Sequence, residues 1–108
     1  MKTTIEKNQN LVTLVNVFTI EPSKQKQLID LLVDATEKVM NKLPGFISAN
    51  IHGSLDGKNV VNYAQWQTKE HFEAVFKNEA AAVHLKQAEQ LAIKVEPNLY
   101  SVYHIDHI

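Results

Sequence analysis

Three residues in the stretch Asn62-Tyr63-Ala64-Gln65-Trp66 have types and spacing that could form a ligand site. Successive side chains of a β-strand alternate between faces, so Asn62, Ala64 and Trp66 would share one face. They would offer an amide, a gap beside a small residue and an aromatic wall. An amide among apolar neighbours costs stability unless something bonds to it. The pattern suits a pocket for a flat, oxygenated molecule; in the simpler interpretation Trp66 is core and Asn62 bonds a neighbouring loop.

The composition argues against several classes of protein. The 108 residues are enough for one domain with a real core. The net charge is -1, and the basic residues are all Lys, whereas nucleic-acid binders usually carry a basic excess that includes Arg. With no Cys, the chain cannot have a disulfide framework or a thiol nucleophile. Three glycines leave no room for a phosphate-binding glycine loop.

The N-terminal segment and the apolar runs of the sequence bear on the cellular location of the protein. The first ten residues are polar and lack the apolar segment of a signal peptide. No apolar run approaches the length that crosses a membrane. We therefore expect a cytoplasmic protein with neither a nucleic-acid nor a membrane partner.

Hydrophobic periodicity predicts the elements that position the candidate site. Strands are expected at residues 11–20, 46–52, 59–67 and 99–108, and helices at 24–43 and at about 79–93. Another helix is expected after Thr68, with Phe72, Val75 and Phe76 on its inner face. Ser23 and Thr68 are the expected helix N-caps. Pro44-Gly45 should end the first helix, Asp56-Gly57 should form a hairpin turn, and Pro97-Asn98 should break the last helix.

This order is β-α-β-β-α-β, the α+β ferredoxin-like pattern, in which helices cover one face of a four-stranded antiparallel sheet. Residues 1–10 are expected to form a flexible arm, and 11–108 a single domain. The first and last strands carry apolar residues on both faces, so the uncovered face would expose an apolar patch. A homodimer that packs one open sheet face against another would bury that patch.

The chain resembles the antibiotic biosynthesis monooxygenase (ABM) family of dimeric α+β barrels. The residues that carry the resemblance are LVTLVNVFTI from Leu11, the long helix that ends at Pro44-Gly45-Phe46, and NYAQWQTKEHFEAVFKN from Asn62. A helix containing His84 and a final strand containing Tyr follow. The resemblance implies a monooxygenase that oxidises a small aromatic or enolisable substrate with O2 and needs no cofactor or metal.

The resemblance also implies roles for particular residues. Asn62 would hydrogen-bond the reacting oxygen, Trp66 would form a wall of the site, and His84 would serve as a polar partner or proton relay. Asn16, Phe72 and Lys86 would contribute to substrate binding. Quinone-forming members carry an aromatic hydroxyl at the position of Phe72 and an Arg near Lys86, and Lys lacks the planar fork of Arg.

Two alternatives stay open on the sequence. One is a dimeric ligand-binding or stress-associated module that uses the same pocket without chemistry. The other is a haem-degrading protein with Asn16 on the first strand and His84 near the ligand position, although Val75 stands where that branch has a Trp. His104, Asp106 and His107 do not predict a metal site, because on a strand only two of them would converge.

Overall fold

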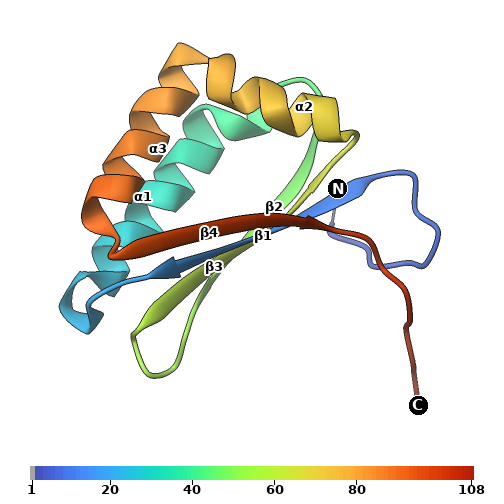
Figure 1. Ribbon diagram of the computed structural model, residues 1–108, viewed down its shortest axis with the longest axis horizontal. Helices are drawn as coiled ribbons and strands as arrows, with labels where there is room; N and C mark the ends of the chain where they lie inside the picture. The colour runs from blue at the N-terminus through green and yellow to red at the C-terminus, as the bar shows by residue number, and fades with distance from the viewer. Residues whose placement is uncertain (1) are drawn as a thin grey trace.

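The computed structural model describes residues 2–108 and has a four-stranded antiparallel sheet in the order β2-β3-β1-β4. The strands are β1 (Val12–Thr19), β2 (Phe46–Gly53), β3 (Asn59–Trp66) and β4 (Lys94–Tyr100). The helices are α1 (Gln25–Lys38), α2 (Lys69–Ala74) and α3 (Glu79–Leu91), with 3-10 turns η1 (Pro22–Lys24), η2 (Met40–Lys42) and η3 (Val75–Lys77). All three helices lie on one side of the sheet, and α1 and α3 run side by side (Figure 1). The predicted α+β ferredoxin-like fold is confirmed.

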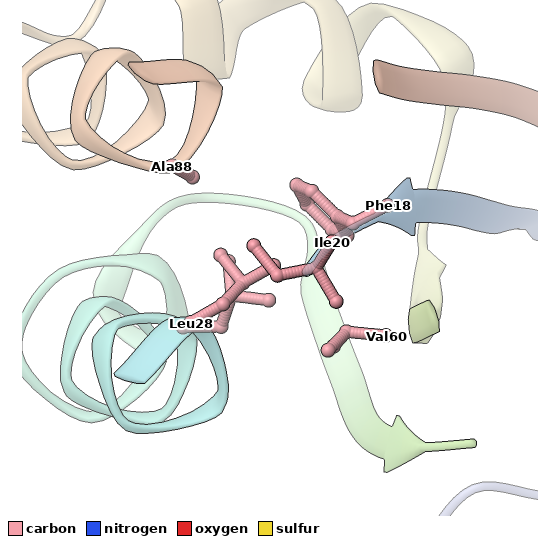
Figure 2. Close-up of a cluster of buried hydrophobic side chains, with 6 residues drawn as sticks. Phe18, Ile20, Leu28, Val60 and Ala88 are labelled. Carbon is pink, nitrogen blue, oxygen red and sulfur yellow. The ribbon is translucent and has the colours of Figure 1, made fainter. Parts of the chain in front are cut away.

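One part of the core joins the two long helices to the centre of the sheet. Phe18 and Ile20 from the end of β1 meet Leu28 of α1, Val60 of β3 and Ala88 of α3, and each is at most 2% exposed. Figure 2 shows these side chains converging between the helices and the strands. Burial of this kind is worth about 25 cal/mol per Å² of apolar surface, which fixes both helices over the sheet.

The helix boundaries differ from the sequence prediction in two places. Thr68 is confirmed as a cap, since its side-chain oxygen accepts a hydrogen bond from the His71 amide at 3.1 Å. The prediction for Ser23 was wrong: it lies inside η1, where the chain is already turned after Pro22, and α1 begins with no side-chain cap. The first helix was predicted to continue to residue 43, but α1 ends at Lys38, and the separate 3-10 turn η2 lies between it and Pro44.

The prediction of a strand over residues 99–108 was wrong. The last strand, β4, begins at Lys94 and ends at Tyr100, and Pro97 lies within it opposite Asn16. Proline is tolerated here because β4 is an edge strand, whose outward amide positions need no partner in the sheet. Residues 101–108 have no regular structure and project from the body of the molecule (Figure 1).

The N-terminal segment 2–10 has no helix or strand and lies against the sheet face that the helices leave open. The Thr3 hydroxyl donates to the Ser48 hydroxyl at 2.7 Å, and the Gln65 amide donates to the Thr4 carbonyl at 2.7 Å. Asn50 also donates to the Thr3 hydroxyl. Gln65 is 1% exposed as a result, so the segment covers one end of the open face.

Candidate functional site

A cavity lies between the helix-covered face of the sheet and the helices above it. The volume of the cavity is about 110 Å³. One water needs roughly 10–15 Å³ by that measure, so the cavity is large enough for a small ligand. The lining residues are Leu14, Asn16, Phe18, Thr36, Met40, Phe46, Ala49, Asn62, Ala64, Trp66, Phe72, Val75, Phe76, Leu85, Ala88, Glu89, Val95 and Pro97.

The sheet side of the cavity carries two amides from neighbouring strands. Asn16 of β1 and Asn62 of β3 are direct partners in the antiparallel ladder. Side chains directly opposite one another in such a ladder have Cβ atoms about 4.5–5.5 Å apart. The side-chain oxygens of both residues are buried and have no hydrogen-bond partner. The strand alternation that predicted an inward Asn62 is therefore correct, and the same rule places Asn16 beside it.

Trp66 adds a hydrogen-bond donor to the same cavity. The residue is 3% exposed, and its indole Nε1 is buried without a partner. Buried polar groups in folded proteins are nearly always bonded, so three unbonded polar atoms in one cavity call for an explanation. An indole nitrogen only donates, whereas an amide can present either its oxygen or its NH2 group. The three groups together can bind a ligand that carries oxygen atoms.

Aromatic rings surround the indole. The Phe46 ring lies 5.5 Å from that of Trp66 in an edge-to-face arrangement, and the Phe72 ring lies 6.4 Å from it. Phe72 also meets Phe76 edge-on at 5.3 Å. Phe72 lines the cavity as an apolar wall supplied by α2, and its role in substrate binding stays a prediction. Flat apolar surfaces of this kind bind a ring system through its faces and edges.

The structure does not bring His84 or Lys86 to the cavity, contrary to the sequence interpretation. The His84 ring lies between α3 and α1, with Nδ1 3.0 Å from the Ala80 carbonyl and Nε2 3.6 Å from a carboxylate oxygen of Asp34. Lys86 is exposed on α3. His84 and Lys86 stand on either side of Leu85, which lines the cavity, and each is turned by about 100° from it around the helix axis, away from the cavity.

Asp34 belongs to a small charged group on the outer surface of the helices. Its carboxylate is 2.8 Å from the ammonium of Lys38 on the next turn of α1. The hydrogen bond from Lys38 is the largest cause that lowers the pKa of Asp34, and His84 adds to it. This group joins α1 to α3 and lies outside the cavity.

Sequence reasoning missed Glu89, the one ionisable side chain among the cavity-lining residues in the described part of the chain. It follows the buried Ala88 and stands four residues after Leu85, so the three share one helical face. That spacing was a usable signal. Thr36 also lines the cavity, but its hydroxyl is already bonded to the Leu32 carbonyl at 2.8 Å.

Over residues 2–108 the structure contains no group of three or more His, Cys, Asp or Glu side chains placed to hold a metal ion. The same residues include no helix that is both long and apolar enough to cross a membrane.

Comparison with known proteins agrees with this architecture. Residues 11–87 match the model of the antibiotic biosynthesis monooxygenase family. The chain belongs to this family. Tetracenomycin-F1 monooxygenase from Streptomyces glaucescens is 50% identical to it over 72 residues, which are 67% of this chain and 64% of that protein. The match therefore spans slightly less than two thirds of the relative's length.

Solved structures of other proteins share the fold, two of them from Streptomyces. The monooxygenase ActVA-Orf6 of Streptomyces coelicolor, crystallised in complex with nanaomycin D, has a TM-score of 0.77 and 24% identity over 91% of this chain and 92% of its own. SnoaB, a cofactor-independent oxygenase from Streptomyces nogalater, has a TM-score of 0.72 and 21% identity over 90% and 97% of the two chains. Both confirm the arrangement of helices on one face of the sheet.

Proposed function

We propose that this protein is a cofactor-independent monooxygenase that oxidises a flat, hydroxylated aromatic or enolisable molecule with O2. The observation that carries the proposal is the convergence of three buried, unbonded polar atoms, from Asn16, Asn62 and Trp66, in a cavity that is otherwise largely apolar. The relative that is 50% identical over 72 residues is named as a monooxygenase of tetracenomycin F1, which supports monooxygenation as the reaction. SnoaB, which has the same fold, is described as a cofactor-independent oxygenase, and this supports a reaction without a cofactor.

The proposed chemistry consumes one O2 for each substrate. The substrate loses a proton to form a phenolate or enolate, which gives one electron to O2 and leaves a substrate radical and superoxide. The pair recombines by forming a C–O bond, and the resulting peroxide takes up a proton. Loss of water from this hydroperoxide leaves a carbonyl group. In total, a CH2 group and O2 become C=O and H2O.

The residues of the cavity would assist this reaction through binding and charge stabilisation. The Trp66 indole donates to a substrate oxygen, which favours the deprotonated form. Asn62 turns its amide so that the NH2 group reaches the same oxygen or its neighbour. Phe46, Phe72 and Val75 exclude water from the ring system, which strengthens these hydrogen bonds.

The haem alternative gains no support from this geometry. His84, the expected ligand, faces Asp34 between two helices and does not line the cavity. The binding module would use the same cavity and the same three polar atoms, and turnover separates it from the enzyme.

We also propose that the protein forms a homodimer through the open face of the sheet. Val15, Val17, Val61 and Tyr63 are half-buried neighbours on that face, beyond the part covered by residues 2–10. A second copy would remove this apolar patch from water. Size-exclusion chromatography with light scattering should give twice the chain mass, and Val17→Glu should give the monomer. A monomeric wild type would overturn the dimer and leave the site unaffected.

Oxygen uptake tests the proposed enzyme. Protein freed of metal and flavin is mixed with anthrones, naphthols and hydroquinones, alongside Asn62→Ala and Trp66→Phe. We expect O2 consumption and a quinone product with the wild type, both reduced at least tenfold in the variants. Uptake no faster than the spontaneous rate for every compound would reject the enzyme and favour the binding module.

A further inference from the structure

Met40 brings a thioether to the wall of the cavity. It is the first residue of η2, just beyond the end of α1, and it is half-buried. Its side chain packs against the apolar cluster that contains Ala64 and Trp66, and the residue lines the cavity with them. The chain contains no Cys, so Met40 carries the only sulfur atom of residues 2–108. That atom belongs to the proposed substrate site.

A thioether reacts with the kind of intermediate that the proposed oxidation forms. That oxidation passes through a hydroperoxide on a substrate bound to Asn62 and Trp66. Oxidants convert Met to its sulfoxide, a common oxidative product in proteins. The Met side chain is unbranched and has three rotatable bonds, so its sulfur can follow the shape of a neighbouring ligand. In a cavity of about 110 Å³, the peroxide and the Met40 sulfur share one small space.

We propose that Met40 is a modification site, at which the substrate hydroperoxide transfers its outer oxygen to sulfur in a minor fraction of reaction cycles. The O–O bond breaks and an S–O bond forms, while the proton of the outer oxygen moves to the oxygen that stays on carbon. The sulfur is oxidised by two electrons and the peroxide is reduced by two. The substrate then leaves as an alcohol in place of the carbonyl compound. This inference rests on the proposed function, because that function supplies the hydroperoxide.

The sulfoxide changes the cavity in two ways. It replaces a flexible apolar side chain by a polar one, among walls that are mostly apolar. Its oxygen also places a hydrogen-bond acceptor in the cavity that holds the unbonded indole nitrogen of Trp66, so it competes with the substrate for that donor. Each oxidation therefore lowers the activity of the protein molecule in which it occurs, and the enzyme loses activity in proportion to its own turnover.

The first test locates the transferred oxygen by mass spectrometry in a protein that carries its own control. Leu55 is fully exposed and lies outside the cavity, so the thioether of Leu55→Met reports any oxidant that diffuses through solution. This variant turns over anthrone under isotopically labelled O2, with catalase and superoxide dismutase present. Peptides that contain positions 40 and 55 are then compared with those of a sample kept without anthrone.

We expect Met40 to gain one labelled oxygen atom in proportion to the quinone formed, while position 55 stays at the level of the sample without anthrone. Adding Asn62→Ala to the same variant should lower oxidation at Met40 together with turnover.

The second test measures the effect on activity. Met40→Leu removes the sulfur with little change in volume. It is compared with the wild type by the number of turnovers completed before half of the activity is lost, a number that does not depend on the starting rate. We expect this number to rise at least about threefold, because the thioether that reacts has been removed. Equal numbers for the two proteins would contradict the loss of activity through Met40.

Two results of the first test would overturn the modification site and leave the proposed function standing. In one, quinone accumulates while Met40 keeps its thioether. In the other, positions 40 and 55 are oxidised to the same extent, which assigns the oxidation to a diffusing oxidant. If the protein consumes no O2 above the spontaneous rate, the proposed function fails, and the oxidation of Met40 by its intermediate fails with it.

Discussion

Asn16 and Asn62 are paired directly across β1 and β3, and each has a buried side-chain oxygen without a hydrogen-bond partner in the same cavity. Strand geometry alone brings the two amides together, since both strands are held in register along their whole length. An unpaired buried amide oxygen costs the fold free energy, about 1–3 kcal/mol for a typical group. A ligand that supplies the missing hydrogen bond would recover that free energy on binding.

Asn62→Ala should reduce kcat/KM at least tenfold while leaving the free energy of unfolding within about 1 kcal/mol of the wild type. The substitution removes an amide oxygen that has no partner in the protein, so little native bonding is lost. Kinetics and urea unfolding of the same preparations measure the two effects.

Asn59→Ala is the matched control for that experiment. Asn59 lies on the same strand, but its amide donates to the Phe18 carbonyl at 3.3 Å, and it does not line the cavity. We expect lower stability and nearly unchanged activity. Loss of stability in Asn62→Ala instead would make Asn62 a structural residue.

The adjacent amides should act on one ligand group and therefore show coupled effects. In a double-mutant cycle of Asn16→Ala and Asn62→Ala, we expect a coupling energy of about 1 kcal/mol or more in kcat/KM, the range found for residues that share a partner. Effects that add within error would show that the two amides bind separate parts of the substrate.

The charged group between α1 and α3 should contribute to stability only above the acid range. Lys38, followed by His84, holds the pKa of Asp34 below its ordinary value of 3.8. A carboxyl with a lowered folded-state pKa stabilises the fold above its unfolded pKa, and this contribution disappears as the pH falls through the folded value. Between pH 6 and pH 2.5, the Tm of the wild type should therefore fall more than that of Asp34→Asn. Equal decreases in both proteins would contradict this assignment.

Gly45→Ala should be strongly destabilising. Gly45 has a φ of 83°, and a Cβ atom there would overlap the ring of His71. Strain of this kind costs roughly 1–3 kcal/mol before the overlap is counted. Gly57→Ala is the comparison, because Gly57 has a similar φ of 79° but the added Cβ would lie no closer than 3.2 Å to its nearest neighbour, the Cβ of Pro22. Thermal unfolding should rank wild type above Gly57→Ala, and Gly57→Ala above Gly45→Ala.

Local patterns predicted the elements that carry the sheet side of the site. The alternation in β3 placed Asn62, Ala64 and Trp66 on one face, and all three line the cavity. These predictions succeeded because the period of a strand depends on the backbone alone. Thr68 was likewise found from its position at the start of an amphipathic segment.

Predictions that depend on contacts between distant segments failed. His84 was expected in the pocket, but the ring faces Asp34 across two helices, a contact that helical spacing cannot reveal. Pro97 was interpreted as a helix breaker because its place at a sheet edge depends on the strand order. Glu89 was missed because a charged residue on an apolar face is usually assigned to solvent, and only the packed helix shows that it borders the cavity.

The cavity has one wall on the hydrogen-bonded sheet and another on short helical segments. Asn16 lies on a strand that is hydrogen-bonded to a neighbouring strand on each side. Phe72, in contrast, belongs to a six-residue helix, and Phe76 belongs to a three-residue 3-10 turn and is 56% exposed. Changes at Phe72 and Phe76 would therefore reshape the ligand space without touching the strand pairing that holds the amides. We therefore expect substitutions at these two positions to change which ligands the cavity accepts while the sheet stays intact, so libraries confined to them are a suitable starting point for redesign.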